Sequence, residues 1–153
     1  MTLAIPQLAA LASGAGFSGA DLVTAVAIAL AESGGNPQAY NPERAAGAAQ
    51  GAGSFGLWQI YLQAHPEFSG VNLFDPQTNA NEAYAVYSQA GGFSPWSTFK
   101  SGAYLAYADT VQQSIAPDVG SVTAADSSTS TPSIFAIVTI GAVLFYAVTK
   151  LFG

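Results

Sequence analysis

Residues 18–37 read SGADLVTAVAIALAESGGNP, and this stretch contains the signals for one complete helix. Ser18 is a favoured N-cap residue, and an aspartate follows three positions later, as in a capping box. A Gly-Gly pair at the other end is a typical helix stop. Because apolar residues recur between these signals at helical spacing, the sequence predicts a helix over residues 19–33. One side of it, ending at Glu32, carries small apolar residues, as expected for the floor of a cleft.

Glu32 is the residue of this helix that points to chemistry. The chain has only 9 acidic and 3 basic residues among 153, and half of its residues are hydrophobic. A carboxylate among so many apolar residues has a desolvation cost. The negative end of the helix dipole lies in the last turn, and it too disfavours an ionised carboxylate. The position therefore favours a protonated carboxyl group, which is what a general acid needs.

Most other local signals also indicate helices. An apolar segment over residues 3–15 predicts a short first helix. Asp75 followed by Pro76 predicts a helix start, and residues 94–96, Ser-Pro-Trp, repeat that signal. Residues 36–53 have loop composition, and no alternating run is long enough for a substantial sheet. A last amphipathic helix carries an apolar stripe of Tyr104, Tyr107, Ala108, Val111 and Ile115. The predicted fold is mainly α.

The C-terminal part of the chain has a different composition. Residues 134–149 read IFAIVTIGAVLFYAVT, and no charge occurs before Lys150. With its flanking residues this segment has about the 20 residues that a membrane-spanning helix needs. We therefore predict three parts: a domain over residues 1–116, a flexible Ser/Thr-rich linker over 117–132, and a single transmembrane anchor over 133–153. A buried core helix is the alternative interpretation of the last segment.

Composition excludes several classes of protein. The formal charge of −6 argues against a nucleic-acid partner, because phosphate binding depends on clustered Lys and Arg. The chain has no cysteine and one histidine, His65, so we expect neither a metal site nor a cofactor. No Lys or Arg precedes Arg44, so a cleavable secretory leader is not expected.

Four motifs resemble one known family. Residues 31–37, AESGGNP, and residues 53–60, GSFGLWQI, are similar to the catalytic Glu-Ser and Gly-Leu-Met-Gln-Ile motifs of the lysozyme-like soluble lytic transglycosylases. Residues 73–79, LFDPQTN, resemble the helix start of that family, and residues 92–99, GFSPWSTF, resemble its phage-encoded, virion-associated members. The chain departs from the family at its Ala-Tyr-Asn motif, for which the surroundings of Tyr87 are the closest match.

The resemblance implies a small lysozyme-like domain that cleaves the β-1,4 bond between N-acetylmuramic acid and N-acetylglucosamine in peptidoglycan. It gives Glu32 the role of catalytic acid and base. The same comparison assigns substrate contacts to Gln59, Ser54, Tyr87 and Trp58. In the transglycosylase reaction the 6-hydroxyl of the sugar closes a 1,6-anhydro ring, so a second carboxylate is not required.

Several alternatives stay open at this point. A lysozyme-type hydrolase would use a second carboxylate, for which Glu43 is the available candidate. A catalytically silent structural or glycan-binding virion component, and a membrane-permeabilising protein with a soluble cap, are two further readings. The predicted anchor and the phage-like segment suggest a protein of the internal membrane of a phage virion, in contact with other virion proteins and active in opening the host wall. A bacterial envelope enzyme is the nearest alternative.

Overall fold

The structure, a computed structural model, describes residues 1–42 and 53–116 of the chain. The predicted linker over 117–132 and the predicted anchor over 133–153 lie outside the described residues. In the part that is described, no helix is both long enough and apolar enough to cross a bilayer. The mainly helical fold predicted from the sequence is confirmed for this part of the chain.

The helix α2, Gly19–Ser33, has the bounds that the sequence predicts. Ser18 occupies the N-cap, but its side chain makes no hydrogen bond to the helix, so the expected capping box does not form. Gly34 ends the helix with φ +61°, in the left-handed region that glycine adopts readily. Residues 25–29 are all fully buried, so the side expected as the floor of a cleft belongs to the core. This burial is typical of a helix that is apolar all round.

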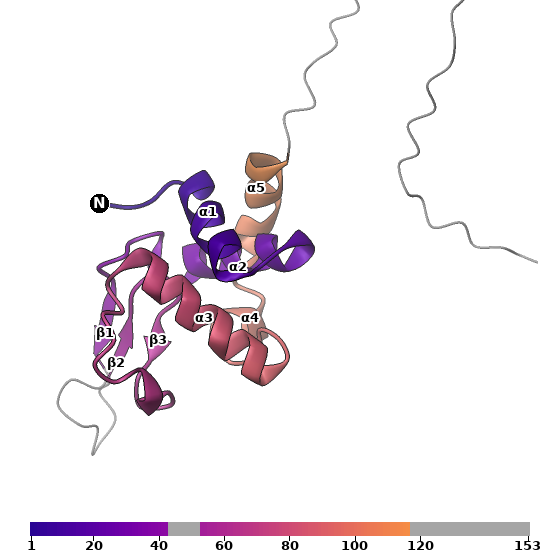
Figure 1. Cartoon of the computed structure of the whole chain (residues 1–153). Coiled ribbons are helices and arrows are strands. Elements are labelled where there is room, and N and C mark those ends of the chain that lie inside the picture. Colours follow the sequence, from indigo (N-terminus) through magenta and orange to yellow (C-terminus); the bar gives the residue numbers. More distant parts are fainter. Residues whose placement is uncertain (43–52, 117–153) are drawn as a thin grey trace, which may run out of the picture. The chain divides into compact units, whose positions relative to one another are not determined.

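Three other helices, each at least 11 residues long, form one helical group with α2 (Figure 1). They are α1, Ile5–Ala15, α3, Pro76–Ala90, and α5, Leu105–Ile115. The first of these packs against α2, α3 and α5, and α5 also packs against α2. The short helix α4, Ser97–Ser101, packs against α2 as well. Side chains from all these helices except α4 contribute fully buried apolar residues to one core.

The helix α3 starts where its sequence signal predicts, whereas α4 starts later than its signal predicts. Asp75 caps α3, and its carboxylate accepts a hydrogen bond of 2.8 Å from the backbone N–H of Thr78. That bond holds the pKa of Asp75 below its ordinary value. By contrast, α4 begins at Ser97 and not at Pro95, where the signal put its first residue, because Trp96 is extended, with φ −82° and ψ 127°. The indole of Trp96 is held in the core, and this tertiary contact overrides the local signal.

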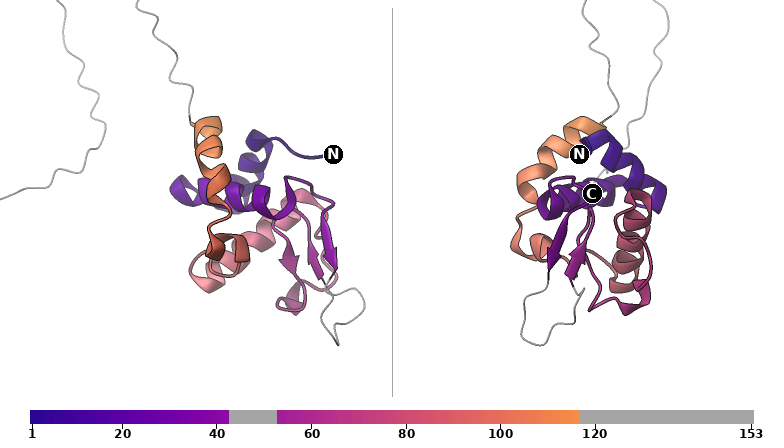
Figure 2. Two further views of the ribbon diagram at one scale, coloured as in Figure 1. Left: turned by 180° about the vertical axis from the view of Figure 1, so that it is seen from behind. Right: turned by 90° about the vertical axis from the view of Figure 1, so that its left-hand side faces the viewer.

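A small antiparallel sheet lies beside the helices (Figure 2). Its strands are β1, Tyr40–Pro42, β2, Gly53–Phe55, and β3, Ile60–Tyr61, in the order β1-β2-β3, and a 3₁₀ turn, Pro66–Phe68, follows. Directly paired residues point to the same face of a sheet. The register therefore puts the polar side chains of one row on one face, namely Asn41, Ser54 and Tyr61.

Two tryptophan side chains connect the sheet to the helices. The indole N–H of Trp58, which is fully buried, donates to the carbonyl of Ala25 in α2 at 2.9 Å. The indole N–H of Trp96 donates in turn to the backbone carbonyl of Trp58 at 2.8 Å. Both N–H groups are thus satisfied away from water, as buried polar groups must be. The pair fixes the segment before α4 and the turn before β3 against the central helix.

Asn79 holds the same turn from the side of α3. It is the one fully buried polar residue among those described, and its Oδ1 accepts from the backbone N–H of Trp58 at 2.9 Å. Its Nδ2 donates to the carbonyls of Phe55 and Leu73 at 2.9 and 3.0 Å. Gly56 packs so closely here that a Cβ atom would lie 2.3 Å from the Leu73 carbonyl oxygen. Only glycine fits at this position, where φ is +73°.

Candidate active site

A cleft of about 240 Å³ lies at the C-terminal end of α2. Three parts of the chain form it: the last turn of α2, the strands β2 and β3 with the turn between them, and the segment leading into α4. Its lining residues are Glu32, Ser54, Gln59, Tyr61, Pro95, Trp96 and Ser97. Of the site residues predicted from the sequence, the structure brings Glu32, Ser54 and Gln59 together in this cleft.

Glu32 is half-buried in the last turn of α2. The hydroxyl of Thr98, on α4, donates a hydrogen bond of 2.7 Å to Oε1 of Glu32. Next to it, the hydroxyl of Ser33 donates to the carbonyl of Ala29 and accepts from the N–H of Gly35. The carboxyl group is therefore held by a rigid helix end on one side and by a directed hydroxyl on the other. Its surroundings are more polar than the apolar floor expected from the sequence.

Gln59 has the most unusual backbone conformation in the cleft. Its φ of +48° is the only positive value for a non-glycine residue in the described ranges. Such conformations are strained and often occur at functional sites. The side-chain amide stabilises the turn, since Nε2 donates to the carbonyls of Ala39 and Gly56 at 3.2 and 2.9 Å. Because carbonyl oxygens only accept, the amide NH₂ group must face them, and Oε1 is the atom that can serve a ligand.

Ser54 and Tyr61 come from the polar face of the sheet. They are paired across β2 and β3, and both line the cleft. The phenol of Tyr61 is hydrogen-bonded to Oε1 of Gln63. Asn41 continues the same row on β1, at the exposed edge. The sheet therefore presents hydroxyl and amide groups, which are the groups that bind sugar hydroxyls.

Trp58 and Tyr87, which were also expected to contact substrate, do not line this cleft. Trp58 is 0% exposed, so a direct contact with a glycan is not available to it, and that expectation is corrected. It acts through the core, by holding the turn that presents Gln59. The expectation was wrong because an aromatic residue in a sugar-binding motif can be there for packing alone.

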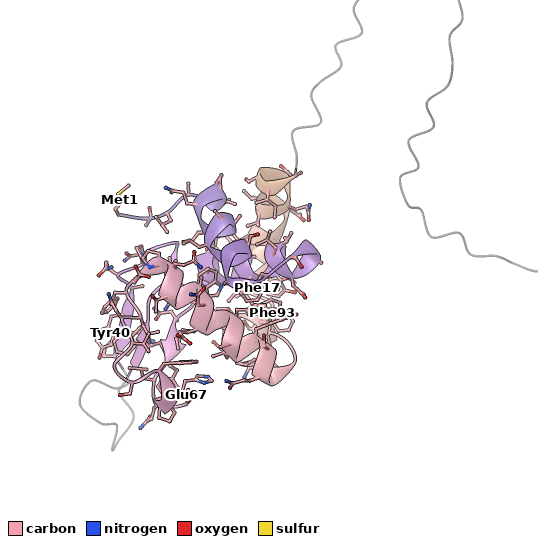
Figure 3. All side chains as sticks on the ribbon, in the orientation of Figure 1. Met1, Phe17, Tyr40, Glu67 and Phe93 are labelled. Atoms are coloured by element: carbon pink, nitrogen blue, oxygen red, sulfur yellow. The ribbon has the colours of Figure 1, made fainter. Side chains whose placement is uncertain are left out.

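Tyr87 lies in an aromatic cluster with Phe17 and Phe93, at ring distances of 5.1 and 4.6 Å, and Figure 3 shows those two phenylalanines close together. Its hydroxyl donates to the carboxylate of Asp21 at 2.6 Å, and this bond raises the pKa of Tyr87. Thr98, and not Tyr87, makes the side-chain hydrogen bond to Glu32.

Sequence reasoning missed Thr98, Tyr61 and Ser97. Thr98 is 66 residues from Glu32, and no local pattern indicates that they meet. Tyr61 could have been found by recognising the hairpin, which pairs it with Ser54. However, the two strands are only three and two residues long, and such short strands give almost no periodic signal. Within residues 1–42 and 53–116, no group of three His, Asp or Glu side chains could hold a metal ion.

Comparison with known proteins gives one match. The model of a family described as a lysozyme-like domain matches residues 9–98, more than half of the 153-residue chain. The match includes every residue that lines the cleft and ends at Thr98. No curated protein and no solved structure shows a significant match.

Proposed function

The chain belongs to the family of lysozyme-like domains, which generally act on peptidoglycan, and from this premise we propose that it is a lytic transglycosylase. The proposed reaction cleaves the β-1,4 bond between N-acetylmuramic acid and N-acetylglucosamine and leaves a 1,6-anhydro end on the muramic acid. Glu32 is the proposed acid and base.

The observation that carries this proposal is the composition of the cleft. Among the described residues, Glu32 is the only carboxylate that lines it. A hydrolase of the two-carboxylate type needs a second carboxyl group about 5–9.5 Å away, across the scissile bond. The residues that the sheet contributes to the same cleft are Ser54 and Tyr61, and neither has a carboxyl group. A mechanism with one carboxyl group fits this arrangement, and transglycosylation is such a mechanism.

In the first step, Glu32 donates its proton to the oxygen of the leaving N-acetylglucosamine. The bond from that oxygen to C1 of the muramic acid breaks, and the oxygen of the substrate's own N-acetyl group forms a bond with C1, so that the positive charge moves onto the N-acetyl group. Glu32 becomes a carboxylate as the bond breaks. The hydrogen bond from Thr98 then strengthens, because donors bind an ionised acceptor more strongly than a neutral one. Thr98 thus favours the transition state over the ground state.

In the second step, the carboxylate of Glu32 takes the proton of the muramic acid 6-hydroxyl. The 6-oxygen forms a bond with C1, and the bond between C1 and the N-acetyl oxygen breaks, so the N-acetyl group is regenerated. Glu32 is protonated again and ready for the next bond. Gln59 and Ser54 are proposed to hold the sugar by hydrogen bonds while these proton transfers occur, since both line the same cleft as Glu32.

The test is product analysis by mass spectrometry after digestion of purified peptidoglycan. Wild-type protein is expected to release muropeptides with 1,6-anhydro ends, and Glu32→Gln is expected to release essentially none. Glu82→Gln, a matched substitution in α3 outside the cleft, should behave as wild type. Reducing ends would instead indicate the hydrolase. Equal and negligible release by wild type and Glu32→Gln would favour a catalytically silent glycan-binding module.

The hydrolase alternative has a direct test at Glu43, which lies outside the described residues. The transglycosylase proposal expects Glu43→Gln to keep the rate and the 1,6-anhydro product. A loss of activity comparable to that of Glu32→Gln would support the two-carboxylate scheme.

We also propose that residues 133–153 anchor the domain to a bilayer, as a protein of the internal membrane of a phage virion. The support is the sequence, which has no charge from residue 133 to 149. The full chain should float with lipid vesicles, whereas a chain ending at residue 132 should stay in solution and keep its wall-degrading activity. Vesicle leakage caused by the full chain without wall degradation would favour the permeabilising alternative. Fractionation of purified virions would distinguish a virion protein from a bacterial envelope enzyme.

A further inference from the structure

A second pocket of about 230 Å³ adjoins the cleft. It shares four lining residues with the cleft, which are Gln59, Tyr61, Pro95 and Trp96. Its remaining walls are formed by Ile60, Ala64, His65 and Val86. The volume is that of about eight water molecules in the liquid, which is enough for a short branch of the substrate but not for a long chain. The pocket is therefore a side arm of the cleft.

The lining of the pocket is mainly apolar. Ile60 and Val86 are buried beneath it, and Ala64 is at its exposed rim. A sugar ring carries hydroxyl groups around its whole edge, and those that enter such a pocket would lose their hydrogen bonds against its walls. A branch with methyl groups matches the walls better.

His65 adds one directed polar group at the rim. Its ring stacks on Phe68 at 5.6 Å, and Nδ1 lies 3.2 Å from Oε1 of Glu67. Because a carboxylate only accepts, Nδ1 carries the proton in this pair. In the neutral imidazole, Nε2 is then an acceptor. In this tautomer of His65 the rim offers an acceptor for an amide N–H beside a wall suited to methyl groups.

We propose that this pocket binds the start of the peptide stem of peptidoglycan, the lactyl group and the first alanine on the muramic acid. The inference rests on the proposed function. The lactyl group is attached to the same sugar ring as the reacting C1, so the stem leaves the glycan within one ring of Glu32. It carries two methyl groups and an amide N–H, which match the apolar walls and the His65 acceptor. The N-acetyl methyl group is a poorer candidate because its amide must reach C1 in the reaction.

The experiment measures binding separately from catalysis. In a Glu32→Gln background, which keeps the substrate intact, affinities are measured for glycan fragments with stem peptides and for the same fragments stripped by an amidase. Peptide-bearing fragments should bind about tenfold more tightly. Ala64→Leu, which fills the pocket from its exposed rim, should remove this difference without weakening the binding of stripped fragments. Ala10→Leu changes another exposed alanine, which is on α1 and lines a different surface hollow, and it should retain the difference.

Three results would overturn the proposal: equal affinity of both fragments for the starting protein, no binding of either, or equal weakening of both by Ala64→Leu. The outcome is independent of the products made by the wild-type protein. A hydrolase with a stem-binding pocket would give reducing ends together with the tenfold preference, whereas a transglycosylase without one would give 1,6-anhydro ends and no preference. A failure here can therefore be told apart from a failure of the proposed function.

Discussion

Replacing Thr98 by valine tests how the cleft controls its acid. Valine has nearly the shape of threonine but no hydroxyl, so the substitution removes the 2.7 Å hydrogen bond to Glu32 and changes little else. A hydrogen bond to a charged group contributes about 1.5–3 kcal/mol. If that bond forms fully only when Glu32 becomes ionised, its loss slows the chemical step by about 10-fold to 150-fold. Because Glu32 is only half-buried and water can replace part of the bond, we expect a value near 10-fold.

The assay is the turnover number on soluble peptidoglycan fragments, with affinity measured in parallel. Thr98→Val should lower kcat and leave KM nearly unchanged, because the bond acts in the transition state. Thr98→Ser, which keeps the hydroxyl, should restore most of kcat. Combining Thr98→Val with Glu32→Gln should cost nothing further. The reasoning is refuted if Thr98→Val retains wild-type kcat, or if serine is as poor as valine with an unchanged melting temperature, since the hydroxyl would then not matter.

Three further predictions concern stability, measured by denaturant unfolding. Asp75→Ala should lower the free energy of unfolding by about 1 kcal/mol at neutral pH. Because the folded pKa of Asp75 is lowered, the stabilisation by its carboxylate is present above about pH 4 and is lost as the pH falls through the folded pKa. Asp75→Asn should keep the cap without this acid dependence. Asn79→Asp should be strongly destabilising, because a carboxylate cannot donate to two carbonyls and each unsatisfied group costs about 1–3 kcal/mol; unchanged stability would show that the turn is held otherwise. The folded pKa of Tyr87 is raised, so its hydrogen bond with Asp21 stabilises the protein below about pH 10, and this stabilisation is lost as the pH rises through the folded pKa. Tyr87→Phe should therefore reduce the fall in the free energy of unfolding at alkaline pH.

The parts of the fold that could be predicted from the sequence are those with local stop and start signals. The helix α2 lies between a serine cap and a glycine stop, and α3 begins at an Asp-Pro pair, so both were found. The sheet was not predicted, because its strands are two or three residues long and show no alternation. The start of α4 was misjudged because the core contact of Trp96 keeps Trp96 itself extended, so the helix begins only at Ser97.

The residues of the candidate site also fall into two groups, those that local motifs identify and those that only the fold brings to the cleft. Glu32, Ser54 and Gln59 could be selected because they lie in short motifs that resemble a family, and the structure brings them into one cleft. Thr98 could not be selected, since its role depends on a contact across 66 residues of chain. Trp58 was placed at the substrate because sequence alone does not distinguish an aromatic residue that stacks on a sugar from one that packs inside.

The hydrogen-bonded pair of Trp58 and Trp96 also gives the domain an internal fluorescent reporter. These are the only two tryptophans in the chain, and they are 0% and 6% exposed. The folded protein should therefore emit at short wavelength and shift to the red on unfolding. Trp96 borders both the cleft and the adjoining pocket, whereas Trp58 borders neither. A glycan bound in the cleft should thus change the emission of Trp96 alone, and Trp96→Phe would identify that signal, so that binding can be followed without a label.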